Sequence, residues 1–156
     1  MDQLKKLTTS LAKNKLTLAL AESASGGYAS YLLTKTPGAS KVFKGSLVVY
    51  SLDTKNKLFK IPKSTLKKTQ GVSNNIAVKL AKGVRKKLES DIGASLVGFA
   101  GPKSKKDTKT GTIFIAISYK NTLLSRKLIL KGSRDQIRKK AANILIAELA
   151  KIFLKK

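Results

Sequence analysis

Ser23 stands where a serine hydroxyl can act as a nucleophile. It follows the apolar run 16–21, which predicts a buried strand, and it precedes the small-residue turn Ser25-Gly26-Gly27 and a helical stretch. In open α/β sheets, ligands gather at the carboxyl ends of strands, and a glycine turn before a helix presents backbone N–H groups. Such a serine could attack a carbonyl while these groups stabilise the oxyanion. On the turn alone, two serines that merely cap the helix are the commoner arrangement.

A serine nucleophile needs a base, and the composition restricts the choice. The chain has no His and no Cys, which excludes an imidazole base, a thiolate nucleophile, a disulfide framework and the commonest zinc ligands. A Ser–Lys pair is the natural remaining arrangement, but 29 lysines are candidates. In "VVYSLDTK", Tyr50 ends a predicted strand, and the next short helix would return Lys55 towards Ser23. The ordinary alternatives stay open, namely a core tyrosine with a wetted hydroxyl and a lysine that faces solvent.

The elements that must position these residues alternate between helix and strand over the first two thirds of the chain, and a meander of strands follows. Helices are predicted over residues 3–14, 26–34, 51–60, 63–69, from Ser73 onwards and 133–154, and strands over 16–21, 42–50, 94–99, 111–119 and 123–130, with a hairpin turn at 120–122. This pattern predicts an α/β fold, a three-layer α/β/α sandwich with a mixed β-sheet of about five strands and helices on both faces. The length is that of one domain, residues 1–156.

The net charge of +25 favours anionic partners. Of the 33 basic residues only four are Arg, and the lysines are spread singly or in pairs, whereas nucleic-acid readers favour the bidentate Arg fork. Nucleic acid is therefore expected to bind only through non-specific electrostatic contacts. The N-terminus lacks the pattern of a signal peptide, and no apolar run approaches the roughly 20 residues that span a membrane. We expect a cytoplasmic protein with no membrane partner.

Several motifs along the chain carry a family resemblance. Residues 21–27, "AESASGG", resemble the A-E-S-C-T-G-G signature of the CinA C-terminal family, the nicotinamide-nucleotide amidohydrolases, and residues 50–55, "YSLDTK", are similar to its Y-S-N-E-A-K. Further matches follow in the family's order at residues 37–40, 42–45, 71–73, 98–102, 111–113 and 132–135. The resemblance extends over essentially the whole chain and is closest to the stand-alone form, without the N-terminal nucleotide-hydrolysing domain of many members.

The resemblance implies hydrolysis of the carboxamide of nicotinamide mononucleotide to nicotinic acid mononucleotide and ammonia, with no metal and no cofactor. It makes Ser23 the nucleophile and Lys55 the general base, with Tyr50 assisting by hydrogen bonding. Such a lysine needs a lowered pKa, which burial and the surrounding positive charge favour. The substrate-binding residues that the resemblance implies are Ser25, Gly26 and Gly27 as donors to the oxyanion or the phosphate, Gly45, Gly101, and Arg134 as a contact to the anionic substrate. A homo-oligomer, dimer or higher, is also implied.

One segment departs from the family pattern. Residues 103–110, "KSKKDTKT", contain no glycine, where the family has a glycine-rich stretch that would fold over a ligand. Lysines can replace backbone N–H groups as point-charge phosphate binders, but with less directional contact. The alternative hypothesis is a catalytically weak or inactive member whose basic surface binds nucleic acid or another polyanion.

Overall fold

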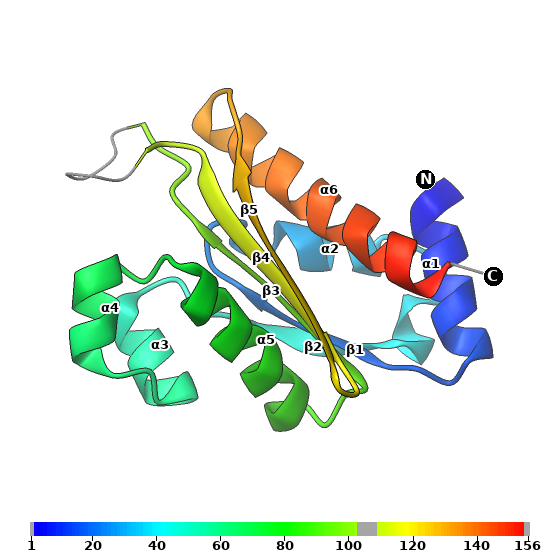
Figure 1. Cartoon of the computed structure of the whole chain (residues 1–156). Coiled ribbons are helices and arrows are strands. Elements are labelled where there is room, and N and C mark those ends of the chain that lie inside the picture. Colours follow the sequence, from blue (N-terminus) through cyan, green and yellow to red (C-terminus); the bar gives the residue numbers. More distant parts are fainter. Residues whose placement is uncertain (1, 103–108, 155–156) are drawn as a thin grey trace.

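The computed structural model describes residues 2–102 and 109–154. Within them, five strands form one sheet in the order β2-β1-β3-β4-β5 (Figure 1). The strands are β1 (Leu18–Glu22), β2 (Phe43–Val48), β3 (Ile92–Gly98), β4 (Thr112–Tyr119) and β5 (Thr122–Ile129). The helices are α1 (Asp2–Lys13), α2 (Tyr28–Thr34), α3 (Leu52–Phe59), α4 (Lys63–Thr69), α5 (Asn74–Lys87) and α6 (Arg134–Phe153), with a short 3-10 turn, η1 (Ala39–Lys41).

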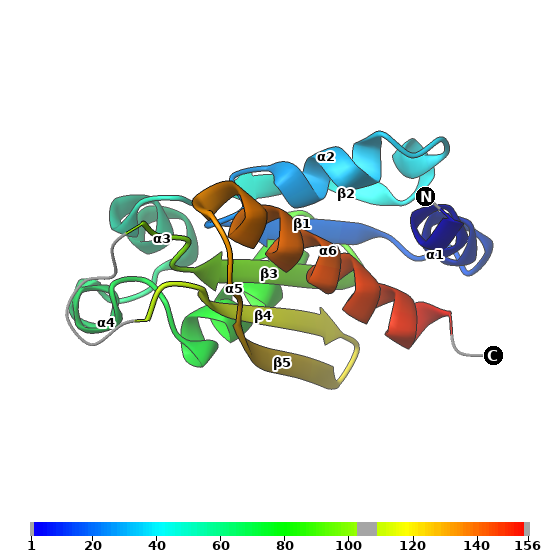
Figure 2. The ribbon, with the colours of Figure 1, turned by 90° about the horizontal axis from the view of Figure 1, so that it is seen from above.

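The sheet is mixed and covered on both faces. Strand β1 pairs in parallel with β2 and β3, while β4 runs antiparallel to β3 and β5. Figure 2 shows α2 and α6 over one face and α5 beneath the other, with α3 and α4 beyond one end of the strands and α1 beyond the opposite end. The predicted three-layer α/β/α sandwich with a mixed sheet of about five strands is confirmed.

The residues of β1 explain why this strand lies in the interior of the sheet, between β2 and β3. Leu18 and Leu20 are fully buried in the core beneath α1, α2 and α6, and Ala19 and Ala21 are fully buried in the core against α5. Because successive side chains of a strand point to opposite faces, an uninterrupted apolar run is compatible only with a strand covered on both sides. The small alanines lie on the α5 side, where that helix approaches the sheet closely. A Cβ at Gly93 of β3 would lie 2.1 Å from a backbone oxygen of α5.

The connections of the strands locate the place where a ligand can bind. The chain leaves β1 through α2, on one face, to reach β2 at one side, and it leaves β3 for β4 at the other side. The neighbouring carboxyl ends of β1 and β3 therefore lead into connections that diverge, which opens a crevice between them. Helices α3 and α4 border this end of the sheet (Figure 1).

Some predicted boundaries differ from the structure for local backbone reasons. The helix predicted from residue 26 begins at Tyr28, because Gly26 and Gly27 both have a positive φ, 58° and 100°. The predicted three-residue turn of the hairpin has two residues, since Tyr119 pairs with Thr122. Lys120 occupies the left-handed region in this turn, with φ 49°, as tight hairpin turns require.

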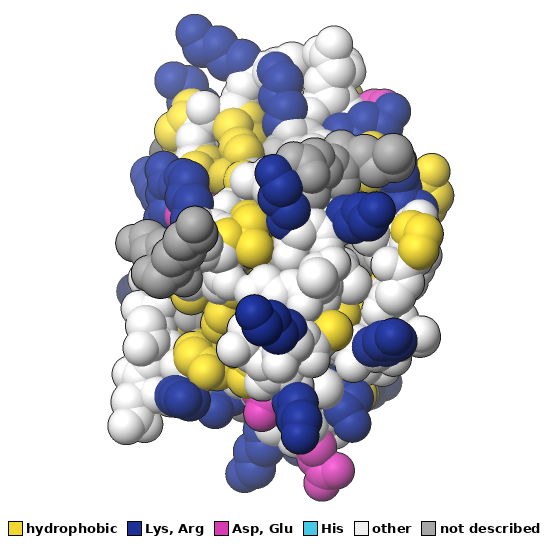
Figure 3. All heavy atoms as spheres, turned by 90° about the vertical axis from the view of Figure 1, so that its right-hand side faces the viewer, with side chains coloured by type: hydrophobic (Ala, Val, Ile, Leu, Met, Phe, Trp, Pro, Cys, Tyr) yellow, Lys and Arg dark blue, Asp and Glu magenta, His cyan; other side chains and the backbone are white. Residues whose placement is uncertain are grey.

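Basic side chains lie over the surface without gathering into one patch on the face that Figure 3 shows. On this face, which carries α1 and the C-terminal end of α6, Lys and Arg side chains stand mostly apart, separated by uncharged ones. Among residues 2–102 and 109–154, none of the helices has the length and apolar character needed to cross a membrane.

Candidate active site

Ser23 is directed towards the α3–α5 side of the sheet by the alternation of β1. Leu20 and Glu22 face the layer of α2 and α6, so Ser23 continues the side of Ala21. Its N–H donates to the carbonyl of Leu96 at 3.0 Å, which extends the parallel ladder with β3 one residue beyond β1. The hydroxyl therefore stands at the carboxyl edge of the sheet on a backbone held by strand pairing.

Lys55 reaches the same edge from the first turns of α3. The N–H of Val49 donates to the carbonyl of Glu22 at 2.8 Å, so the chain after β2 stays beside β1. Ser51 then begins the helix, because its Oγ accepts from the N–H of Thr54 at 3.1 Å. One turn later Lys55 points back towards the end of the sheet, and it is only 2% exposed.

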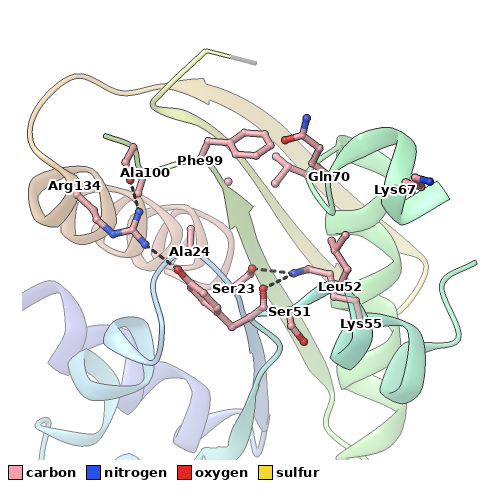
Figure 4. Close-up of a pocket in the computed structure, with 14 residues that line it drawn as sticks. Ser23, Ala24, Ser51, Leu52, Lys55, Lys67, Gln70, Phe99, Ala100 and Arg134 are labelled. Carbon is pink, nitrogen blue, oxygen red and sulfur yellow. Dashed lines mark hydrogen bonds between the residues drawn. The ribbon is translucent and has the colours of Figure 1, made fainter. Parts of the chain in front are cut away.

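The amine of Lys55 has the hydrogen-bond environment of a general base. Its Nζ lies 3.0 Å from Ser23 Oγ and 3.3 Å from the carbonyl oxygen of Tyr50 (Figure 4). It also lies 2.8 Å from the carbonyl oxygen of Val49. A neutral amine has two N–H bonds and one lone pair. The two carbonyls can only accept, so they take the two hydrogens, and the lone pair is left for the Ser23 hydroxyl. This is the orientation needed to remove the hydroxyl proton.

Burial also adjusts the basicity of Lys55. Removal from water penalises the charged ammonium and lowers the pKa of Lys55 from its ordinary 10.5 to about 8. No carboxylate is among the causes of the shift, so nothing acidic offsets the effect. At pH 7 roughly a tenth of the amine is then neutral, compared with far less than one percent for an exposed lysine.

Tyr50, Arg134 and Gly101 form a second group at the crevice. Arg134 donates from Nη2 to the Tyr50 hydroxyl at 2.8 Å and from Nη1 to the carbonyl of Gly101. Arg134 is the first residue of α6, which Ser133 begins through a reciprocal capping box with Gln136. The guanidinium thus joins the end of β2, the β3–β4 connection and the start of α6, and two of its three nitrogens already have protein acceptors.

A cavity of 590 Å³ joins the two groups. Ser23, Lys55, Tyr50, Gly101 and Arg134, all predicted from the sequence, lie on its wall. Nine further residues complete the lining: Ala24, Ser51, Leu52, Lys67, Gln70, Val72, Gly98, Phe99 and Ala100. Figure 4 shows the Ser23–Lys55 contact on one side of this space and Arg134 across from it.

Glu22 was given no role from the sequence. Its carboxyl group accepts hydrogen bonds from groups of the turn that were expected to face a ligand. Ser25 Oγ donates to Glu22 Oε2 at 2.7 Å and the N–H of Gly27 at 3.0 Å, and the N–H groups of Ala29 and Ser30 also point to this carboxyl group. Because Glu22 continues the face of β1 that packs on α2, it lies directly beneath the first turn of that helix. The Ser25 side chain is fully buried and does not reach the cavity.

Two backbone donors remain beside Ser23. Within the described residues, the N–H groups of Ala24 and Ser25 meet no hydrogen-bond acceptor, whereas that of Gly26 donates to the carbonyl of Ser23 at 3.0 Å. Arg138 of α6 holds the carbonyls of Ala24 and Ser25, at 3.0 and 3.1 Å, and so fixes the orientation of both peptide units. The N–H after a nucleophilic serine is a common oxyanion donor.

The described residues contain no group of three or more His, Cys, Asp or Glu side chains that could hold a metal ion. The polar groups on the cavity wall include the hydroxyl of Ser23, the amine of Lys55, the phenol of Tyr50 and the guanidinium of Arg134.

A sequence model of the CinA C-terminal domain matches residues 2–153. The chain belongs to the CinA C-terminal domain family. Relatives include CinA-like proteins of Petrotoga mobilis, 41% identical over 132 residues (84% of this chain, 33% of that protein), and of Dictyoglomus thermophilum, 40% identical over 129 residues (82% and 31%). The chain spans about a third of the length of these relatives.

Solved structures agree with the CinA fold. The competence or damage-inducible protein of Enterobacter asburiae superposes with a TM-score of 0.92 at 27% identity, covering 97% of this chain and 96% of that one. A CinA superfamily protein of Escherichia coli also gives 0.92, at 22% identity, covering 97% and 88%, and at this identity the likeness concerns the fold alone.

Several residues that the CinA resemblance assigned to substrate binding lie elsewhere. Gly45 pairs with Ala19 in the first half of β2, at an irregularity of the ladder, and it does not line the cavity, which opens at the opposite end of these strands. Gly26 and Gly27 also lie outside the cavity lining, and their N–H groups donate to the Ser23 carbonyl and to Glu22 Oε2. Of the expected donors at this turn, only the backbone N–H of Ser25 lacks a partner among the described residues.

Sequence reasoning also missed residues that shape the CinA site. At Gly71, where φ is 74°, a Cβ would lie 2.6 Å from Leu52 Cδ2 and 3.5 Å from Lys55 Cδ, so the missing side chain leaves room for α3. A glycine directly after a helix was a usable signal, since such positions favour a positive φ. The alternation of β1 would similarly have directed Glu22 to α2. Of the departing segment 103–110, residues 103–108 lie outside the described residues.

Proposed function

We propose that this chain hydrolyses the carboxamide of nicotinamide mononucleotide by a Ser–Lys mechanism, releasing ammonia and nicotinic acid mononucleotide. The observation that carries the proposal is the buried contact of 3.0 Å between Lys55 Nζ and Ser23 Oγ, with carbonyl acceptors on the other side of the amine. Membership of the CinA family supports the same chemistry.

In the first half of the reaction, neutral Lys55 takes the hydroxyl proton as Ser23 Oγ bonds to the carboxamide carbon, and the carbonyl electrons move to its oxygen. The free N–H groups of Ala24 and Ser25 are the donors available to this oxyanion. When the carbonyl re-forms, the C–N bond breaks, and the nitrogen takes the proton from Lys55 and leaves as ammonia. An ester on Ser23 remains.

In the second half, Lys55 removes a proton from water as the water oxygen attacks the ester. The bond to Ser23 Oγ then breaks, the proton returns to that oxygen, and the acid product is released. Tyr50, held by Arg134 at 2.8 Å, supplies a polar hydroxyl at the wall of the cavity that can orient the substrate. Each step uses groups that line the cavity or adjoin Ser23.

The direct test is ammonia release from nicotinamide mononucleotide by the wild type, Ser23→Ala, Lys55→Met and Lys57→Met. The first two variants should lose more than about 1,000-fold in kcat/KM, because each removes a group that bonds or moves a proton. Lys57 is the matched control, since it lies on the same helix, is exposed and pairs with Asp53 at 2.8 Å, and its variant should keep full activity. Equal rates in all four proteins would refute the mechanism.

A further inference from the structure

A second cavity, of 570 Å³, adjoins the one at Ser23. Gln70, Val72 and Phe99 belong to the walls of both, so these three side chains form the boundary between them. Figure 4 shows Gln70 and Phe99 facing each other on the side of the Ser23 cavity away from Lys55. A ligand whose reacting group lies at Ser23 can therefore extend past this boundary into the second space.

The second cavity has a strongly positive wall. Lys68 of α4, Lys109 before β4 and Lys127 of β5 line it, and no Asp or Glu does. We refer to the space that these three lysines line as the lysine groove. None of the three is in an ion pair within residues 2–102 and 109–154, whereas other surface lysines, such as Lys57 and Lys139, pair with carboxylates on their own helices. Exposed cations from three separate elements around one hollow attract an anion.

Gln70 lies at the boundary between the two cavities, and its side-chain oxygen has no hydrogen-bond partner among the described residues. Its Oε1 is buried and is the one such side-chain atom without a partner among the described residues. Gln70 ends α4 in the left-handed conformation, with φ 54°, and its N–H donates to the carbonyl of Leu66. Buried polar atoms are nearly always paired, so this oxygen calls for a donor that the described residues do not supply. A hydroxyl is a donor of this kind.

Arg134 is a poor choice for the anionic end of a substrate, although the resemblance suggested it. Its two terminal nitrogens donate to Tyr50 and to the carbonyl of Gly101. These contacts use two of the five N–H donors of the guanidinium and fix its plane, so an anion could bind only to the remaining donors in that orientation. The lysines of the groove are not fixed by hydrogen bonds of this kind within the described residues. The lysine groove, on the far side of Gln70, is therefore better suited than Arg134 to bind the phosphate of a nucleotide substrate.

We propose that the lysine groove binds the phosphate of the nucleotide substrate, with Gln70 Oε1 accepting a hydrogen bond from a ribose hydroxyl. The identity of the nucleotide rests on the proposed function, but the anion site does not. Lys127 Nζ lies 6.0 Å from the ring centroid of Phe114, so this cation is already held over the floor of the groove.

The test compares Lys127→Met and Lys68→Met with Lys87→Met. Lys87 is a matched control because its Nζ lies over the ring of Phe59 at 5.9 Å, yet it lines neither cavity. We expect each groove variant to raise KM for nicotinamide mononucleotide about tenfold with kcat within about twofold, as loss of one charge-assisted contact requires. KM for nicotinamide riboside, which lacks the phosphate, should not change.

A binding measurement separates this inference from the proposed function. Titration calorimetry with inorganic phosphate should show weaker binding to Lys127→Met than to the wild type or Lys87→Met, whether or not any amide is hydrolysed. Phosphate binding that falls in the groove variants of an inactive protein would support the groove and refute the amidase. Hydrolysis with the same KM in all variants, or phosphate binding equal in all of them, would overturn the groove assignment.

Discussion

Replacing Lys55 with Met tests whether burial sets the basicity of this amine. Met keeps much of the length and apolar character of the lysine stem but cannot carry a proton. In the wild type, a pKa lowered from 10.5 to about 8 makes the folded chain release a proton that the unfolded chain still holds. Between these two pH values the unfolded state binds more protons, so the free energy of unfolding rises with pH.

The size of the effect follows from the same two values. A pKa change from 10.5 to about 8 corresponds to about 3 kcal/mol, of which about 2.5 kcal/mol should be regained between pH 7 and pH 10. Met also leaves the carbonyls of Val49 and Tyr50 without their donor, and that cost is the same at every pH. The pH dependence of the difference between the two proteins therefore isolates the buried charge.

The assay is urea unfolding of the wild type, Lys55→Met and Lys57→Met at intervals from pH 7 to pH 10. The free energy of unfolding of Lys55→Met, taken relative to that of the wild type, should fall by about 2.5 kcal/mol as pH rises through this range. The pKa of Lys57 is raised by its hydrogen bond to Asp53, so Lys57 titrates above the range and its variant should run parallel to the wild type. A constant difference between Lys55→Met and the wild type would refute the reasoning.

Three further predictions concern the same site. The kcat/KM of the wild type should rise with pH through a midpoint near 8, because only neutral Lys55 can take the proton, and a flat profile between pH 6 and pH 9 would exclude that role. Glu22→Gln should lower the free energy of unfolding by about 3 kcal/mol in urea titrations, since an amide cannot accept from all the donors that converge on the carboxyl group, and an unchanged midpoint would contradict this. Gly71→Ala should destabilise the fold by about 2 kcal/mol and reduce activity by displacing α3. Gly38→Ala, where φ is 86° and the nearest atom to a Cβ is Thr8 Cγ2 at 3.9 Å, should show the backbone cost alone, and equal activity in both variants would contradict the clash.

The local order of the chain was largely readable from its sequence. Apolar alternation and capping serines depend on neighbouring residues, so strand β1, helix α5 after Ser73 and the β4–β5 hairpin were all predicted within a few residues. The errors occurred at helix and turn ends, as at Gly27 and Lys120, where one left-handed backbone conformation moves a boundary. The resemblance to the CinA family added the expected order of motifs, and the family is confirmed.

Contacts between segments far apart in the chain could not be predicted from local sequence patterns. Nothing local distinguishes Lys55 from 28 other lysines, because its low exposure arises only when α3, the end of β2 and Gly71 pack around it. The surroundings of Arg134 and Gly45 depend on tertiary packing in the same way. Arg134 meets acceptors from two remote loops, and Gly45 pairs at the wrong end of its strand to reach the cavity.

The sequence by itself thus determined the elements, the family and the serine at a strand end, since these follow from short-range periodicity and motif order. The tertiary structure decided which amine is buried and, within the part of the chain that the structure describes, which backbone donors lack an acceptor and where lysines without an ion pair line a cavity. Desolvation and hydrogen-bond pairing are properties of the packed chain, because they depend on which remote groups exclude water from a given atom.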